Sequence, residues 1–466
     1  MSVEGLFVPE IEQSIGIEVY ATDSLGIGGV IKKSIEDFLV EEMLVDHSLA
    51  EIIPSKDVAK RQVLGSSPIR DRYLLCVLVK RDWDTFIALR KVAEQLGINT
   101  DKIQIAGIKD AKAVTAQHVT IEDVSAEDVQ RIRVKDIEIR PIGYLHNELS
   151  SYYLLGNSFQ VTIHAISHVR STVRNRITKT VEKLKTIGGV PNFFGHQRFG
   201  TTRPITHLVG KAIIKGNLEK AAMLFLAEPF PSEHQDSRQA RERLKTTLDF
   251  NQALSTFPKQ LRYERFMLTY LVEKPDDFSG AFRTLPIRLR ELFVQAYQSY
   301  LFNKFLSKRI EGKLSLNKVE VGDQVVSVDR SGLPMTAMSK MVTDGNLGEI
   351  NRAIHAGKMR LAFPLVGFKQ RFSLGVQGET EKHVLEEEDV NPQEFKIKTM
   401  PEVSSRGGLR TATTPLNNFS LQEIADASTK PSRRKAKVNF VLNRGSYATI
   451  VLRELIKPRN PIKAGF

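Results

Sequence analysis

Apolar and polar positions along the first 200 residues follow the periods of both strands and helices. The run from Tyr73 to Val79 is apolar and rich in strand-forming residues. Phe159, Val161 and Ile163 alternate with polar neighbours, as in a half-buried strand. Asp84, in contrast, precedes apolar residues at helical spacing, as a helix N-cap does. This mixture predicts an α+β fold built on an antiparallel or mixed sheet.

The pattern changes near residue 205 and changes back near residue 409. Between these points we predict three long helices, a β-rich stretch and a charged segment that forms an exposed connector. These segments are, in order, Leu208–Leu226, Arg262–Val272, Leu289–Ile310, Val319–Val328 and Glu386–Asp389. Strand patterns return beyond Leu409. We therefore predict one domain inserted into another, with the divided domain at 1–204 and 406–466 and the inserted domain at 205–405.

Basic residues outnumber acidic ones, with 67 Lys and Arg against 54 Asp and Glu and a net charge of +13. Clustered cations gain affinity for polyanions by releasing counterions, so this excess favours a nucleic-acid partner. The helix predicted from His168 to Ile187 has one strongly basic face. For this single helix, RNA contact and a plain solvated face are equally good interpretations. A second basic run, from Lys430 to Lys437, is expected to lie in a connector.

Several classes of protein are disfavoured by what the sequence lacks. The single cysteine, Cys76, allows neither an internal disulfide nor a thiolate zinc site, and it predicts a reducing, cytoplasmic environment. No apolar run is long enough to cross a membrane. Without a Walker loop, a GxGxxG turn or an HExxH pair, an NTPase, a nicotinamide enzyme and a zinc hydrolase are disfavoured. We expect neither cofactor nor metal, and we expect His164 and His168 to be surface residues with ordinary partners.

Three segments combine polar or aromatic side chains with glycine. In the first, residues 106–117, Asp110 stands before a short helix-forming run, and an isolated aspartate there is usually an N-cap. The second places Asn157 and Phe159 two residues apart, on one face of a strand. The third, residues 190–200, contains three Phe, an Arg and two Gly. Aromatic and basic side chains in such a combination suit unstacked bases and phosphates.

Taken together, these segments resemble the tRNA pseudouridine synthase D (TruD) family, with six motifs in the family's order over nearly the whole chain. The motifs are E-D-F-x-V-E-E at Glu36–Glu42 with a lysine at Lys32, G-x-K-D-x-x-A-x-T-x-Q at Gly107–Gln117, G-N-x-F at Gly156–Phe159, G-V-P-N-[YF]-F-G-x-Q-R-F-G at Gly189–Gly200, a helix at Gln295–Asn303, and G-S-[YF]-A-T with R-E-L at Gly445–Leu455. Ile35 and Asn443 depart from the family's prolines. The long inserted region resembles the archaeal and eukaryotic branch.

The resemblance implies a pseudouridine-synthase domain with a mixed, mainly antiparallel sheet, interrupted by an inserted α/β domain. It also implies isomerisation of a uridine in tRNA, typically uridine-13, with Asp110 as nucleophile and Lys32 as its cationic partner. Phe38 and Phe159 would hold the base, and Asn157 would hydrogen-bond near it. The full set of implied substrate-binding residues is Phe38, Asn157, Phe159, Lys109, Phe194, Gln197 and Arg198. tRNA is the implied partner, and a monomer without an obligatory protein partner is our default expectation.

Two other functions stay open from the sequence. A non-catalytic RNA-binding or RNA-folding protein on the same scaffold would bind tRNA in a salt-sensitive manner and leave it unchanged. A nucleoside hydrolase that depends on an aspartate would release free uracil. The isomerase differs from both in its product, because it breaks the glycosidic bond, turns the base and rejoins it through carbon 5.

Overall fold

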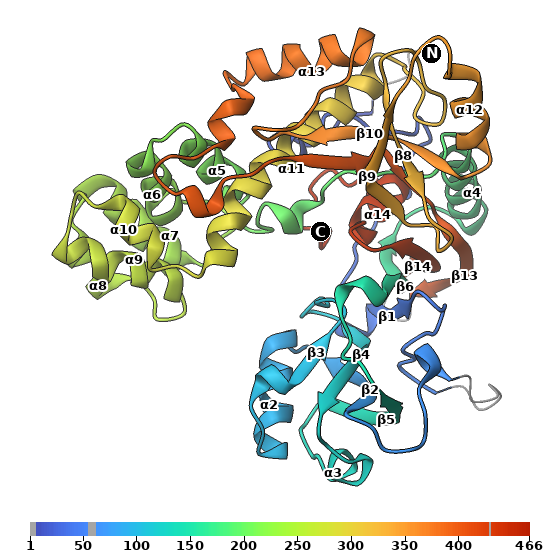
Figure 1. Ribbon diagram of the computed structural model, residues 1–466, viewed down its shortest axis with the longest axis horizontal. Helices are drawn as coiled ribbons and strands as arrows, with labels where there is room; N and C mark the ends of the chain where they lie inside the picture. Colours follow the sequence, from blue (N-terminus) through green and yellow to red (C-terminus); the bar gives the residue numbers. More distant parts are fainter. Residues whose placement is uncertain (1–5, 55–61, 428–429) are drawn as a thin grey trace.

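The computed structural model describes residues 6–54, 62–427 and 430–466, and Figure 1 shows how its elements are arranged. Within these residues the largest sheet has eight strands, in the order β13-β14-β6-β1-β4-β2-β5, with β3 paired to β4 beside that path. β1 and β4 run parallel, and the other pairs run antiparallel. The expected α+β fold with a mixed, mainly antiparallel sheet is confirmed. The strands are β1 Phe38–Leu44, β2 Tyr73–Arg81, β3 Ile103–Ile105, β4 Val114–Glu122, β5 Ile137–Leu145, β6 Leu154–Ile166, β13 Asn417–Ala427 and β14 Lys430–Asn443.

Strand register places four side chains from neighbouring strands on one face of this sheet. Val40 of β1 lies opposite Phe159 of β6 on one side and Thr115 of β4 on the other. Lys80 of β2 lies opposite Thr115 in turn. Because residues directly opposite each other in a sheet point to the same side, these side chains form a continuous row across four strands.

Helix α2 (Thr85–Leu96) covers the part of this face that β2 and β4 form. Asp84 caps the helix as predicted, since its carboxylate accepts the backbone N–H groups of the next turn, and Gly97 ends it. The apolar side of α2 packs on β2 in a core that includes Leu74, Cys76, Leu78, Ala88, Leu89 and Val92. Helix α3 (Ala126–Gln130) begins at a capping box that Ser125 and Asp128 form.

Helices α4 (Arg170–Thr186) and α14 (Ala448–Ile456) bury apolar side chains in one core with β6 and β14. Every residue of α14 is buried. On α4, Ile177 and Leu184 face the core, and several basic side chains lie on the other side. Some of these already have partners, because Arg170 pairs with Asp426 and Arg176 donates to the Gly26 carbonyl.

A helical lobe follows at the left of Figure 1. The single helix predicted over Leu208–Leu226 is wrong, because Gly216 adopts a left-handed conformation (φ +73°) and Asn217 caps a second helix. The predicted helices at Arg262–Val272 and Leu289–Ile310 are confirmed as α9 and α11. The helices are α5 Thr206–Ile214, α6 Leu218–Ala227, α7 Gln235–Thr247, α8 Phe250–Thr256, α9 Arg262–Glu273, α10 Phe278–Arg283 and α11 Ile287–Glu311.

A second sheet has the strand order β11-β10-β8-β9 and packs near α11. The β-rich stretch predicted from Val319 becomes a strand only at Gln324, because a turn from Glu320 to Asp323 comes first. The strands are β8 Gln324–Val328, β9 Pro334–Met341, β10 Met359–Leu365 and β11 Gly408–Thr411, and the helices nearby are α12 Leu347–His355 and α13 Gly375–Glu387. A short helix, α1 (Glu10–Gln13), stands near the chain's start.

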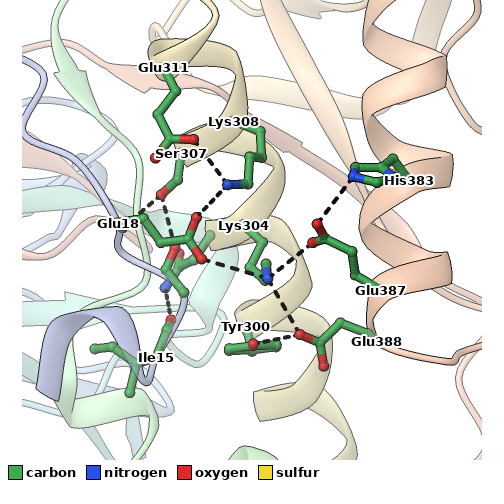
Figure 2. Close-up of polar contacts among 12 residues, drawn as sticks. Ile15, Glu18, Tyr300, Lys304, Ser307, Lys308, Glu311, His383, Glu387 and Glu388 are labelled. Carbon is green, nitrogen blue, oxygen red and sulfur yellow. Dashed lines mark hydrogen bonds and ion pairs between the residues drawn. The ribbon is translucent and has the colours of Figure 1, made fainter. Parts of the chain in front are cut away.

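The charged segment at Glu386–Asp389 is not simply an exposed connector, because it closes helix α13 and joins it to α11. Figure 2 shows the contacts. Lys304 of α11 lies within 3.6 Å of Glu18, Glu387 and Glu388, and the Tyr300 hydroxyl donates to Glu388 Oε1 at 2.7 Å. With Lys304 and Tyr300 packed against it, Glu388 is half-buried. The N-terminal segment, α11 and α13 are thereby held together.

The basic run from Lys430 to Lys437 lies in strand β14 and not in a connector, so that prediction is wrong. Strand formation there follows from pairing with both β6 and β13. β12 (Thr413–Thr414) pairs with β7 (Val190–Pro191), and the chain leaves the second sheet after Thr411. The domain limits at 204 and 405 stay predictions. Among the described residues, no helix is both long and apolar enough to cross a membrane.

Candidate active site

A cavity of about 440 Å³ lies over the part of this row of side chains that Val40 and Phe159 form. The sheet forms its floor, the segment from Gly107 to Asp110 one wall, and the segment from Arg444 to Thr449 another. Seven of the nine predicted site residues line it: Lys32, Phe38, Lys109, Asp110, Asn157, Phe159 and Gln197. Phe194 and Arg198 do not. Five of the six motifs, which are far apart in the sequence, therefore meet at this cavity, and the helix at Gln295–Asn303 does not line it.

The floor of the cavity is aromatic. Phe38 and Phe159 meet edge to face with 6.1 Å between ring centres, and Phe159 stacks on Phe440 at 5.4 Å. Phe440 lies opposite Phe159 in the register of β14 and β6, which puts both rings on one face. Phe440 was not among the predicted site residues, although the apolar residues Val438, Phe440 and Leu442 at alternate positions are typical of one face of a strand. Rings in this arrangement present an apolar surface of the kind on which a base can pack.

Asp110 is half-buried at the end of a loop, and hydrogen bonds from neighbouring side chains hold the backbone of this loop. The Thr85 side chain accepts the Lys109 N–H at 3.2 Å and donates to the Lys109 carbonyl at 3.1 Å. The Lys80 ammonium donates to the Asp110 carbonyl at 2.7 Å. Residues 111–113 form bends and lead directly into β4, so the expected short helix is absent. An N-cap role for Asp110 is therefore excluded.

Lys32 enters the same cavity in a left-handed backbone conformation (φ +54°) that few residues other than glycine adopt. Its ammonium lies 4.5 Å from the centre of the Phe38 ring, a cation–π contact. Within the described part of the chain, no ion pair joins Lys32 to Asp110. The structure brings the two side chains to one cavity and places the cation over the aromatic floor.

Lys109 belongs to the cavity wall, and its side chain is buried in an ion pair with Glu42. Lys109 Nζ lies 2.5 Å from Glu42 Oε2, and the two side chains are only 3% and 0% exposed. The His118 N–H donates to the other carboxylate oxygen at 2.9 Å. Burial raises the pKa of Glu42, but Lys109 and His118 more than offset it, so the net shift is downward. Lys109 thus supports the Asp110 loop and has its charge already matched.

Asn157 lies opposite Glu42 in the sheet and lines the cavity. Its side-chain carbonyl oxygen is buried and, among the described residues, accepts no hydrogen bond. A buried polar atom without a partner is costly, and such atoms gather where a ligand supplies the missing group. The oxygen is therefore available to accept an N–H group of a bound base.

The segment from Val190 to Gly200 borders the site and contributes one side chain to its lining. Gln197 lines the cavity, and its Oε1 accepts the Thr449 hydroxyl at 3.3 Å. Phe194 is buried beneath the Arg410 guanidinium, which lies 3.9 Å from its ring centre. Arg198 donates to the side chains of Ser299 and Gln295 of α11. Phe194 and Arg198 fix this segment to its surroundings.

Arg410 connects the segment that contains Asn192 with the cavity wall that contains Gly445, a link that the sequence did not predict. It donates to the Asn192 backbone and side-chain carbonyls at 2.8 and 2.7 Å, and to the Gly445 carbonyl at 2.8 Å. Burial lowers the pKa of Arg410 to about 10, so the guanidinium is charged at neutral pH. No local pattern marks this residue, because its partners stand up to 218 positions away. The lining residues Arg444, Ser446, Tyr447 and Thr449 were also missed, although they lie in or beside the last motif.

The fold defines the class of protein. A crystal structure of a TruD protein from Methanosarcina mazei matches this chain with a TM-score of 0.81 and 39% sequence identity, over 97% of this chain and 98% of that one. The chain thus has the α+β fold of the pseudouridine synthases, a class of isomerases.

The family is narrower than the class. A family model described as tRNA pseudouridine synthase D (TruD) matches residues 14–455. A protein of Methanosarcina acetivorans with the name "Probable tRNA pseudouridine synthase D" is 41% identical over 97% of each chain. A protein of Pyrococcus abyssi with the same name is 34% identical over 94% of this chain and 98% of its own. The chain belongs to the tRNA pseudouridine synthase D (TruD) family.

Proposed function

We propose that this protein isomerises a uridine in tRNA, at position 13, to pseudouridine, with Asp110 as the nucleophile. The observation that carries the proposal is the position of Asp110 in a cavity that Phe38 and Phe159 line, with Phe440 stacked on Phe159. Membership of the TruD family supports tRNA as the substrate class, and position 13 is the typical target that the motif resemblance implies. The net charge of +13 suits a polyanionic substrate.

The reaction is an internal exchange of bonds. The bond from ribose carbon 1 to base nitrogen 1 breaks, the base turns, and carbon 1 bonds to base carbon 5. Carbon 5 loses its proton, and nitrogen 1 takes one up. No electrons are gained or lost and no water is consumed overall. A carboxylate suits the role of nucleophile because an aspartate is ionised at pH 7. Its charge would otherwise be costly in a half-buried site, and the nearby cations Lys32 and Arg444 offset that cost.

The target base must leave its stack to reach Asp110. Extrusion costs a few kcal/mol, and stacking on an aromatic side chain returns roughly 1–3 kcal/mol. Phe159 therefore approximately balances the extrusion, and Asn157 adds a hydrogen bond to the base. The surplus must come from contacts between basic side chains and phosphates. A cavity of about 440 Å³ is within the range of small-molecule sites and suits a single nucleoside.

The test is incubation of the protein with tRNA transcripts labelled with tritium at carbon 5 of uridine. The proposal predicts release of the label to water, retention of the base in the chain, and pseudouridine at position 13. Free uracil as product would indicate a nucleoside hydrolase. Salt-sensitive binding without label release would indicate a non-catalytic RNA-binding protein. Label release that maps to another uridine would keep the activity and refute the position.

A further inference from the structure

Lys80 is a fully buried lysine in the wall behind the proposed nucleophile. It is 0% exposed, and its ammonium donates to the backbone carbonyls of Trp83 at 2.8 Å and of Asp110 at 2.7 Å. Among the described residues it forms no ion pair within 4.0 Å. Lysine is almost never buried without a paired charge, because desolvation of an ammonium is costly. The position of this residue therefore needs a reason other than general stability.

The strand pattern makes the lysine more unexpected. Leu74, Cys76 and Leu78 precede it on the same face of β2, and all three are buried in the core under α2. The next residue in this period is Lys80, where an apolar side chain would continue the core. Lys80 lies opposite Thr115, close to where the chain passes from the Asp110 loop into β4. Its side chain leaves the sheet toward that loop and ends on it.

We propose that Lys80 is a positioning residue for isomerisation, which fixes the main chain of Asp110 and supplies a buried positive charge behind its carboxylate. The inference rests on the proposed function of Asp110. Thr85 holds the preceding residue, Lys109, through both its N–H and its carbonyl. Lys80 then holds Asp110 itself, so the nucleophile's backbone has support at two successive residues. Lys80 does not line the cavity, so we expect it not to contact a base bound there.

The charged groups around Lys80 indicate how pH affects the support that Lys80 gives to Asp110. Burial lowers the pKa of the Lys80 ammonium to about 8, Asp110 and Asp84 oppose that shift, and Lys109 adds to it. The ammonium is therefore charged at pH 7 and loses its proton as the pH rises through about 8. A neutral amine gives no charge to balance the carboxylate of Asp110. The rate of the bond-breaking step should fall over this interval, while binding through phosphates is retained.

The experiment compares wild type, Lys80→Met, Lys80→Arg and Lys91→Met. Lys91 is the matched control, because it is an exposed lysine on α2 whose partner, Glu94, is exposed too. Each protein is mixed in excess with carbon-5-labelled tRNA from pH 6.5 to pH 9.5, and single-turnover label release, tRNA affinity and thermal stability are measured. Small misplacements of reacting groups cost about 100-fold in rate. We expect that loss in Lys80→Met at pH 7, with tRNA affinity within threefold of wild type.

The pH profile separates positioning from plain structural support. Wild type and Lys91→Met should lose label release above about pH 8. Lys80→Arg should keep more activity at pH 7 than Lys80→Met and should lack that alkaline decline, because a guanidinium stays charged. A folded Lys80→Met with the wild-type rate overturns the inference. If that variant does not fold, a wild-type rate that is constant from pH 7 to pH 9.5 overturns it. A wild type that releases no label refutes the proposed function, and the inference falls with it.

Discussion

The buried ion pair of Lys109 and Glu42 gives a prediction that distinguishes support of the Asp110 loop from contact with substrate. In Lys109→Met, Glu42 keeps its hydrogen bond from the His118 N–H but loses its cation in a site with 0% exposure. Removal of one partner from a buried ion pair costs about 3–5 kcal/mol, because the other charge stays buried and unmatched. We expect a loss of that size in the free energy of unfolding, measured by urea titration at pH 8. Under conditions in which the variant is folded, tRNA affinity should be unchanged.

The dependence on pH adds a second test of the same cause. In wild type the pKa of Glu42 is lowered, so its contribution to stability is present above the ordinary carboxyl pKa and is lost as the pH falls through the folded value. Without Lys109, only His118 still opposes the effect of burial, so the pKa of Glu42 is higher than in wild type. Glu42 then protonates at a higher pH, and the deficit of Lys109→Met relative to wild type should shrink from pH 8 to pH 5.

Two further variants test whether the unmatched charge of Glu42 is the cause. Lys109→Met combined with Glu42→Gln buries no charge and should be more stable than Lys109→Met alone. Lys91→Met, which removes an exposed ion pair, should change stability by no more than about 0.5 kcal/mol. The reasoning is refuted if Lys109→Met costs less than 1 kcal/mol, or if its main effect is a loss of tRNA affinity with normal stability. That second result would restore Lys109 to direct substrate binding.

Three more predictions follow from the site and its supports. Phe159→Leu keeps part of the packing against Phe38 and Phe440, and it should lower single-turnover label release about tenfold or more. Its tRNA affinity should change less than threefold. A large loss of affinity at a normal rate would contradict the stacking role. Arg410→Met should lower the midpoint of thermal unfolding, because three bonds to carbonyl oxygens of Asn192 and Gly445 are lost, and unchanged stability would refute its role as a link between the two walls. Gly156→Ala should unfold or strongly destabilise the protein, since the new Cβ would lie 2.1 Å from the Leu442 carbonyl oxygen. A normal unfolding midpoint would show that β6 and β14 can separate at low cost.

Much of the site could be predicted because its chemistry is encoded in short motifs. Asp110, Asn157 and Phe159 were identified by the motifs around them, and strand periodicity placed the last two on one face. Likewise, Asp84 was predicted as a cap, since capping depends only on neighbours in the chain.

What could not be predicted depends on contacts between distant segments. Lys80 looks like an ordinary strand residue until the Asp110 loop is placed above it, and Arg410 has no local signature at all. Glu42 stands in a motif, but its partner Lys109 comes from another strand's loop. Phe194 and Arg198 have the composition of an RNA contact and instead pack against Arg410 and α11. Residue type indicates what a side chain can do, and only the fold decides which partner it meets.

The most direct test of the central claim is single-turnover release of label from carbon 5 of uridine by Asp110→Asn, beside wild type, at saturating protein. Asparagine has nearly the same shape and cannot form the carboxylate nucleophile. We predict wild-type tRNA affinity, an unchanged unfolding midpoint, and label release at least 1,000-fold slower than wild type, on the order of the loss when an essential catalytic group is removed. Label release by Asp110→Asn at the wild-type rate would contradict the assignment of Asp110 as nucleophile.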